Sequence, residues 1–318
     1  MSASRTVRCL SVTVIALFAS AIGIQNAFAQ WTYRAAPQPL IRNISVFTNN
    51  PVTGTNTLIV STLTDGMYKG TDNGTNTTWQ KINTGIPVVQ ARAHATVSAT
   101  DYYAVTDGAG VFKTINGGTS WAPINGAGAT ALGCLQARTI AVPVTTAPRT
   151  LLVSTSCRNN SGLFQSIDDG ANWTRLGPAA GMPNSLPGDV QSSALNRSGS
   201  GATALFLLAT TNYGIFKSTD GGATWATANV GIPGTNVFST SFSSPTAGVT
   251  TDLLAYVHGS GIYRSADTGG TWIPSNVGLP ANPAALAGLS RESGQILYIG
   301  LDQAGVYKTV NGGLNWTA

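Results

Sequence analysis

Carboxylate side chains recur at one place in a repeated sequence unit, close to a Gly that opens a short apolar segment. They are Asp65, Asp107 and Asp302. Glycoside hydrolysis requires two carboxyl groups facing the scissile bond, one as an acid and one as a nucleophile or base. Two of these three Asp residues, if the fold brings them together, could therefore act on a glycan.

Basic and aromatic side chains accompany these carboxylates. Arginine binds carboxylates and phosphates through paired N–H donors, so it is the expected ligand for an anion. The candidate binding residues are Arg42, Arg92, Arg138, Asp189, Tyr213 and His258.

A structural role for the same charges is the alternative. Within one unit Arg42 could pair with Asp65. In the next unit Arg92 could pair with Asp107, and exposed ion pairs of this kind contribute little stability. Arg138 has no acidic residue in the B–C loop of its own unit, which favours it as the residue that binds an anion.

The composition makes this gathering of charge informative. Charged residues make up 9% of the 318 residues, against roughly 25% in an ordinary soluble domain. So few charges exclude a coiled coil, and 42% hydrophobic residues with seven Trp exclude a disordered chain. The formal net charge is +5, but the basic residues form no run, so we expect no nucleic-acid partner.

One unit is repeated six times. Its most recognisable part has the pattern Ser/Thr-x-Asp/Asn-x-Gly-x-x-Trp, and consecutive Trp residues lie 42 to 52 residues apart. The third position is Asp72, Asn116, Asp168, Asp220, Asp267 or Asn311, the first of these in a looser copy. Because Asp and Asn accept hydrogen bonds from the backbone of their own turn, we expect a structural role for these six residues.

The unit predicts four short strands, A to D. An apolar run such as 253–257 precedes a segment that begins with Gly, such as 261–264, and the Trp motif follows as the C–D turn. No segment has a sustained 3.6-residue period. Such repeats predict an all-β fold, a β-propeller of four-stranded antiparallel blades. We expect six blades, and seven remain possible because 31–39 reads as an additional D strand.

The repeated motif resembles the Asp box of the bacterial neuraminidase repeat family of propellers. The likeness extends from Trp31 to Trp316, and Asn116 and Asn311 depart mildly from the pattern. The resemblance implies that the box turns lie at the periphery, on the face opposite the one that binds ligands. The B–C loops and the starts of the A strands, which carry the polar residues named above, would then line the ligand face.

The resemblance also implies three kinds of function. Sialidases and xyloglucanases hydrolyse glycans, but 42–44 reads Arg-Asn-Ile where the family has Arg-Ile-Pro, and Glu292 is the only Glu. Photosystem II assembly factors and sortilin-type receptors bind proteins without catalysis. A lectin-like module would stack sugars on Tyr213, Tyr102 or Tyr103. We expect a binding or scaffolding module for a protein or glycan ligand; a glycoside hydrolase is the alternative, and whether the chain is an enzyme stays open.

The first 29 residues have the pattern of a secretory signal peptide. Arg5 and Arg8 precede an apolar stretch, and Ala27 and Ala29 supply the small-x-small cleavage site. The pattern predicts a single propeller domain over 30–318, secreted or periplasmic, with no membrane span after cleavage. We expect a monomer.

Two cysteines remain after cleavage, Cys134 and Cys157. Strands A and B of the third unit pair about an Ala-Pro-Arg turn, which brings the two cysteines within reach of a disulfide bond. Without a Cys-x-x-Cys motif and with only two His, the sequence predicts no metal site and no cofactor.

Overall fold

The computed structural model describes most of the repeated region. It covers residues 41–50, 55–73, 76–87, 90–144, 146–157, 160–183, 195–198, 204–210, 212–242, 253–280, 286–293, 296–301 and 304–318. The predicted signal peptide, 1–29, and the additional strand predicted at 31–39 lie outside these residues.

The described residues form an all-β structure. Their only helical turns are of the 3₁₀ type, Gly128–Thr130 and Pro178–Ala180, as the lack of a helical period predicts. The first three sheets comprise β1 (Ile41–Asn50), β2 (Thr55–Thr62), β3 (Gly66–Asp72) and β4 (Thr77–Lys81); β5 (Ala91–Thr96), β6 (Tyr102–Thr106), β7 (Gly110–Thr114) and β8 (Ala122–Pro123); and β9 (Ala137–Val144), β10 (Thr150–Thr155), β11 (Gly162–Ser166) and β12 (Thr174–Arg175). The other three comprise β13 (Leu195–Ser198), β14 (Leu205–Thr210), β15 (Gly214–Ser218) and β16 (Ala226–Thr227); β17 (Val237–Phe242), β18 (Leu253–Val257), β19 (Gly261–Ser265) and β20 (Ile273–Pro274); and β21 (Leu286–Ser293), β22 (Ile296–Leu301) and β23 (Gly305–Thr309).

Each sheet is an antiparallel meander whose strands pair in chain order, as predicted for A to D. Five of the described sheets have four strands and the sixth has three. In the sixth, a bridge between Lys308 and Thr317 stands where the other sheets have their fourth strand.

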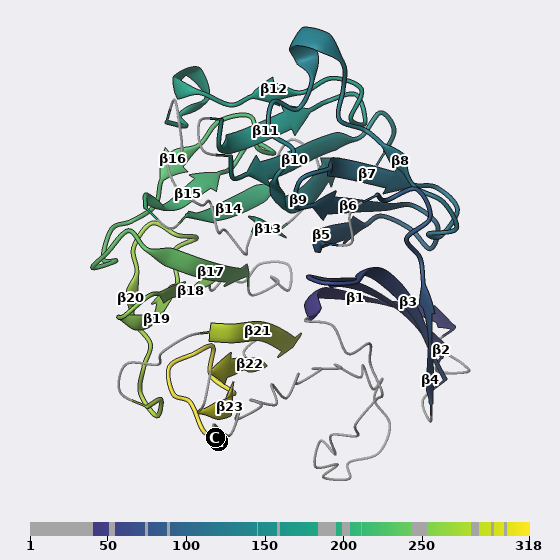
Figure 1. Cartoon of the computed structure of the whole chain (residues 1–318). Helices are drawn as coiled ribbons and strands as arrows, with labels where there is room; N and C mark the ends of the chain where they lie inside the picture. The colour runs from purple at the N-terminus through teal and green to yellow at the C-terminus, as the bar shows by residue number, and fades with distance from the viewer. Residues whose placement is uncertain are drawn as a thin grey trace, which may run out of the picture.

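The sheets follow one another around a common centre (Figure 1). The first strands of successive sheets are in contact from β1 to β5, β9, β13, β17 and β21. Closure between the sixth sheet and the first, and therefore the number of blades, stays a prediction.

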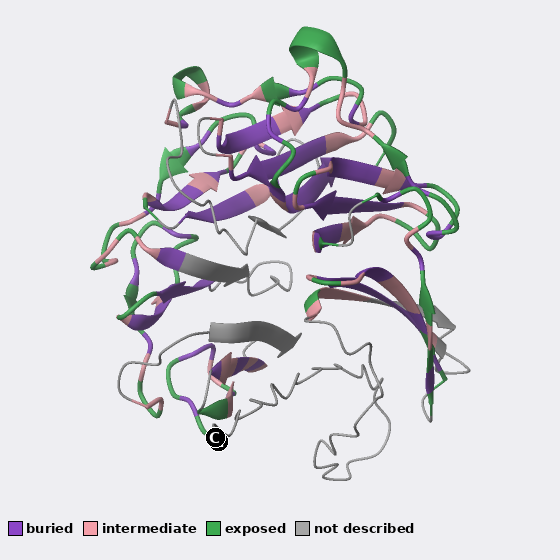
Figure 2. Ribbon diagram, in the orientation of Figure 1, coloured by how far each residue is buried: buried purple, intermediate pink, exposed green. Residues whose placement is uncertain are grey.

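The hydrophobic core is divided into five clusters, each drawn from two consecutive sheets. Buried residues follow the strands and exposed ones the hairpins (Figure 2). The Trp of each later unit packs into the cluster that it shares with the preceding sheet, for example Trp272 against Leu207 and Ala209. The Trp therefore fills the space between one sheet and the next.

The indole groups also join the sheets by hydrogen bonds. Nε1 of Trp121 donates to the carbonyl oxygen of Ile82 at 2.7 Å, and Nε1 of Trp272 donates to that of Ala228 at 2.8 Å. Trp173 and Trp316 make equivalent bonds, whereas Trp225 bonds Gly222 of its own turn. Nε1 of Trp79, in the first sheet, is buried and has no partner among the described residues.

The box residues fold their own hairpins. In the fifth sheet the Ser265 hydroxyl donates to Oδ1 of Asp267 at 2.7 Å and accepts from the Gly269 N–H at 2.8 Å. Oδ1 of Asp267 also accepts from the Thr271 N–H at 2.8 Å, and this bond, followed by the one from Ser265, holds the pKa of Asp267 well below its usual value. The same bonds recur around Asn116, Asp168, Asp220 and Asn311.

The looser first copy differs: Asp72 is buried and accepts from the Thr77 hydroxyl at 3.2 Å. All six hairpins lie at the end of the sheets that we name the box end.

Candidate functional site

The opposite end of the sheets carries the B–C hairpins and the starts of the inner strands, and we name it the B–C end. In the second sheet Thr106 pairs with Gly110 at this end, while Tyr102 pairs with Thr114 at the box end. The predicted site residues that the structure describes all belong to the B–C end. Asp189 and Asp302 lie outside the described residues.

An Asn side chain shapes the B–C hairpin of several sheets. Oδ1 of Asn125 accepts from the Val111 N–H at 2.7 Å, and its Nδ2 donates to the Ala109 carbonyl at 3.0 Å. Gly110 lies between them with φ of 81°, and a Cβ there would stand 2.2 Å from Oδ1 of Asn125. A Gly is therefore required at this position.

The role of this Asn was not predicted from the sequence. The equivalent residues are Asn83, Asn229 and Asn276, each four residues after a Trp. That regular offset was the available signal.

Replacing Asn125 with Ala is expected to destabilise the protein and to release the hairpin that holds Asp107. The change leaves a backbone N–H and a carbonyl without their partner, which costs about 2 kcal/mol of unfolding free energy. Urea denaturation measures this loss. Asn229→Ala is the matched control, because it should cost a similar amount in the fourth sheet without altering anion binding at the B–C end. An Asn125→Ala protein as stable as wild type would contradict the assignment.

Three arginines occupy equivalent positions at the B–C end. Arg42, Arg92 and Arg138 are each the second residue of an inner strand, in β1, β5 and β9. At each of them the pairing with the neighbouring strand shifts register, so the Arg is the extra residue of a β-bulge. A bulge redirects the side chain it carries. The bulges in β17 and β21 fall at Phe238 and Ala287, so among the bulges described at this end those with a basic residue belong to the first three sheets.

Two of these arginines share one carboxylate. Nε of Arg92 donates to Oδ2 of Asp107 at 3.0 Å, its NH2 group also bonds this atom, and NH1 of Arg138 donates to it at 2.9 Å. The predicted pair of Arg92 with Asp107 is confirmed. Arg138 was expected to find no acidic partner in the B–C loop of its own unit; its partner is Asp107, from the B–C hairpin of the preceding sheet.

The arginines determine the charge of Asp107. Burial raises the pKa of this carboxyl, but the hydrogen bond from Arg92 and the positive charges of Arg138 and Arg92 lower it by more, so it stays ionised. Three guanidinium groups and one carboxylate give the cluster, which we name the arginine cluster, a net charge of +2.

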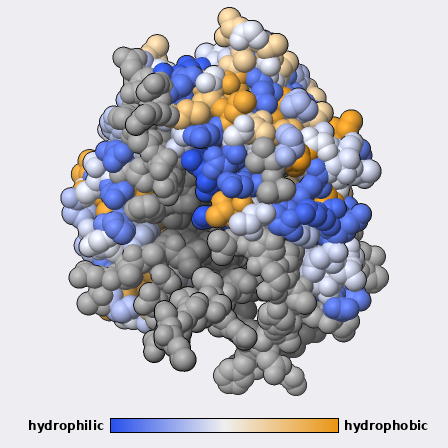
Figure 3. Space-filling view, in the orientation of Figure 1, coloured by the Kyte–Doolittle hydropathy of each residue, from blue (hydrophilic) through white to orange (hydrophobic). Residues whose placement is uncertain are grey.

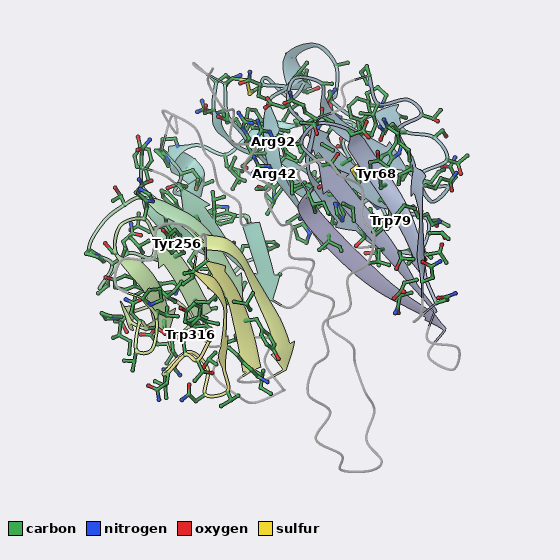
Figure 4. All side chains as sticks on the ribbon, turned by 60° about the horizontal axis from the view of Figure 1, so that its bottom comes forward. Arg42, Tyr68, Trp79, Arg92, Tyr256 and Trp316 are labelled. Atoms are coloured by element: carbon green, nitrogen blue, oxygen red, sulfur yellow. A yellow bond between two sulfur atoms is a disulfide. The ribbon has the colours of Figure 1, made fainter. Side chains whose placement is uncertain are left out.

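Arg42 is the exposed member of the arginine cluster. Figure 4 shows it beside Arg92 at the inner ends of the sheets. Partial burial, and then the positive charges of Arg92 and Arg138, lower the pKa of Arg42 from its usual value. Among the described residues Arg42 has no hydrogen-bond or ion-pair partner, so the suggested pair with Asp65 is not formed.

Asp65 binds other residues of its own sheet. Its carboxylate accepts from the Lys81 ammonium group and from the Tyr68 hydroxyl. These two hydrogen bonds, that from Lys81 first, lower the pKa of Asp65, while burial and then Asp65 raise the pKa of Tyr68 to about 12. Neither Asp65 nor Asp107 is thus held protonated, as the acid of a glycosidase would be.

Tyr213 and His258 lie in the B–C hairpins of the fourth and fifth sheets, whereas the arginine cluster belongs to the first three. Tyr213 is half-buried against the core between the third and fourth sheets. His258 is exposed on the hairpin of the fifth sheet, where its backbone N–H donates to the Asn236 carbonyl at 2.9 Å. Tyr102 and Tyr103 are both fully buried, so the suggestion that they stack sugars is wrong. Hydrophilic residues gather near the middle of the molecule in Figure 3.

The disulfide bond predicted between Cys134 and Cys157 is confirmed, with their Cα atoms 5.9 Å apart. The two cysteines lie just outside β9 and β10 rather than within them. The described residues contain no group of three or more His, Cys, Asp or Glu that could hold a metal ion. No helix in the described part of the chain is long and apolar enough to cross a membrane.

No protein-family model and no curated protein matches the sequence. Solved structures do. The GH74 xyloglucanase of Xanthomonas campestris is 17% identical with a TM-score of 0.54, covering 75% of this chain and 38% of the enzyme. YCF48 bound to D1 peptide is 14% identical with a TM-score of 0.57, covering 88% and 80%. The extracellular domain of the hybrid two-component system BT3049 from B. thetaiotaomicron is 13% identical with a TM-score of 0.57, covering 85% and 33%.

At these sequence identities the similarity shows the fold and not the function. The chain spans little more than a third of the xyloglucanase and a third of the sensor domain. The chain is an all-β protein of four-stranded antiparallel sheets whose structural neighbours are β-propellers.

Proposed function

We propose that the protein is an exported binding module of the Asp-box type, and that the arginine cluster binds an anionic group of a protein ligand. The observation that carries the proposal is the presence of Arg42, Arg92 and Arg138 at the bulge of three successive inner strands. Because two of them already share one carboxylate, the geometry suits carboxylate oxygens.

Three observations favour a protein ligand over a glycan. Tyr102 and Tyr103 are buried and cannot stack on a sugar ring. A protein of similar fold, YCF48, is seen with a bound peptide. The described carboxylates Asp65 and Asp107 are both engaged in ion pairs and ionised, which favours binding over hydrolysis.

The wider architecture belongs to the same proposal. We propose that the protein forms a closed ring of six blades, that its first 29 residues are removed, and that it is a monomer in an extracellular compartment. The disulfide bond supports an oxidising location, and BT3049, of similar fold, is an extracellular domain.

Replacing Arg42 with Gln is expected to weaken the binding of acidic peptides about tenfold or more, since a hydrogen bond to a charged group contributes roughly 1.5–3 kcal/mol. Fluorescence anisotropy with a labelled peptide series measures the change, each peptide carrying a free or an amidated C-terminal glutamate. Lys217→Gln is the matched control: it removes the same charge in the fourth sheet, where Nζ donates to the Thr268 carbonyl at 3.2 Å.

Equal affinity of the Arg42→Gln and wild-type proteins for every peptide in the series would overturn the proposed site. Preferential binding of uronic or sialic oligosaccharides over the peptides would replace the protein ligand with a glycan.

A further inference from the structure

Asp107 holds the position that an anionic ligand would take. Its Oδ2 atom accepts hydrogen bonds from Nε and NH2 of Arg92 and from NH1 of Arg138, two residues that belong to different sheets. These are the donors with which an arginine grips a ligand carboxylate. Oδ1 has no partner among the described residues.

The backbone fixes this carboxylate at the cluster. Asp107 forms a β-bridge with Gln136, and its N–H donates to the Gln90 carbonyl at 3.1 Å. The side chain of Asp107 is 16% exposed, and those of Arg92 and Arg138 are 24% and 15% exposed. A ligand can therefore reach these groups, but it meets them already paired.

Arg42 differs from its two neighbours. It is exposed and has no hydrogen-bond or ion-pair partner among the described residues. The positive charges of Arg92 and Arg138 act on it and lower its pKa. Like charges at close range repel one another, so an incoming anion stabilises this arrangement.

We propose that Asp107 is an internal competitor for the anionic group of the ligand. The ligand first meets Arg42, and it can take over the bonds that Nε and NH2 of Arg92 and NH1 of Arg138 now make only by displacing the Asp107 carboxylate. Asp107 thereby limits the affinity for a simple anion and selects ligands with more than one anionic group. This inference rests on the proposed function of the arginine cluster.

Removing the charge of Asp107 tests the proposal. Asp107→Asn keeps the size and the backbone bonds of the residue and raises the net charge of the cluster from +2 to +3. Isothermal titration with citrate, a probe with several carboxylates, is expected to show at least a tenfold gain in affinity over wild type. The gain should shrink as salt is added, because salt screens exposed charges. Asp107→Ser should show a gain in the same direction.

Asp101→Asn is the matched control. It makes the same change in net charge, but Asp101 pairs with Arg149, which stands in the A–B turn at the other end of the sheets. Its affinity for citrate should stay within twofold of wild type.

The outcomes separate the two proposals. Equal or weaker binding of citrate by both Asp107 variants, with Arg42→Gln still weakening it, overturns the competitor role and leaves the binding site in place. No citrate binding by wild type or by any Asp107 variant overturns both proposals. An equal gain in Asp101→Asn also overturns the competitor role, because net charge alone would then explain the effect.

Discussion

Lowering the pH from 7 to about 4.5 is expected to reduce the unfolding free energy by about 3 kcal/mol through one residue, His94. This imidazole is 4% exposed in β5. Its Nε2 lies 2.9 Å from the Ser45 hydroxyl of β1, and its Nδ1 is buried without a partner among the described residues. Burial penalises the imidazolium form and lowers the pKa of His94 to about 3.

The sign follows from proton uptake. In the unfolded chain the pKa of a histidine is about 6.5. Between pH 6.5 and 3 the unfolded chain therefore binds a proton that the folded protein does not. The unfolding free energy consequently decreases by about 1.4 kcal/mol for each unit by which the pH is lowered. The two units from 6.5 to 4.5 give the expected loss.

Urea denaturation at several pH values measures this slope. His94→Gln, whose amide can still bond Ser45, should be less stable at pH 7 but should lose the slope between pH 6.5 and 4.5. His258→Gln is the control, because His258 is the other of the two histidines and lies on an exposed loop. A slope that persists in His94→Gln would show that other groups cause it.

Replacing both Cys134 and Cys157 with Ser is expected to lower the unfolding free energy by about 3 kcal/mol. The bond joins residues separated by 23 positions, and closing a loop of that length in the unfolded chain accounts for an effect of this size. The same loss should appear when the wild-type protein is reduced. Denaturation with and without reductant measures it, and the double variant, which has no bond to reduce, should not respond.

The disulfide bond also stands next to the arginine cluster. The Leu135 carbonyl accepts from the N–H groups of Gly108 and Gly110 at 3.0 and 2.9 Å. The Gln136 carbonyl accepts from the Ser156 N–H at 2.9 Å. The bond at Cys134 therefore anchors the segment against which the Asp107 hairpin rests.

We accordingly expect the double Ser variant to bind citrate with altered affinity even at temperatures where it is fully folded. Unchanged affinity together with lowered stability would limit the disulfide bond to a stabilising role. Unchanged stability would contradict the first part of the prediction.

Much of the fold could be predicted because the repeated unit is a local pattern. The predicted segments at 253–257 and 261–264 became β18 and β19 with boundaries that agree within one residue. The Trp motif predicted the C–D hairpin. In the structure its indole also joins two sheets, since one unit supplies the indole and the preceding unit supplies the carbonyl. The pairing of Cys134 with Cys157 also followed, because it lies within one unit.

The arginine cluster depended on contacts between units. Arg138 binds Asp107 of the preceding sheet, whereas Asp65 binds Lys81 of its own sheet instead of Arg42. The β-bulges that redirect the three arginines leave no distinct signal in the amino-acid pattern. Tyr102 and Tyr103 are both buried, because the second sheet packs against the first sheet on one face and against the third on the other.

The sequence by itself determined the repeat, the strands, the box turns and the disulfide bond, since each depends on residues that are close in the chain or related by a single hairpin. The tertiary structure decided which charges meet, which tyrosines are covered and where His94 lies. Those outcomes depend on how neighbouring sheets stack and on where their inner strands bulge, and side chains from separate units come together only when that stacking is formed.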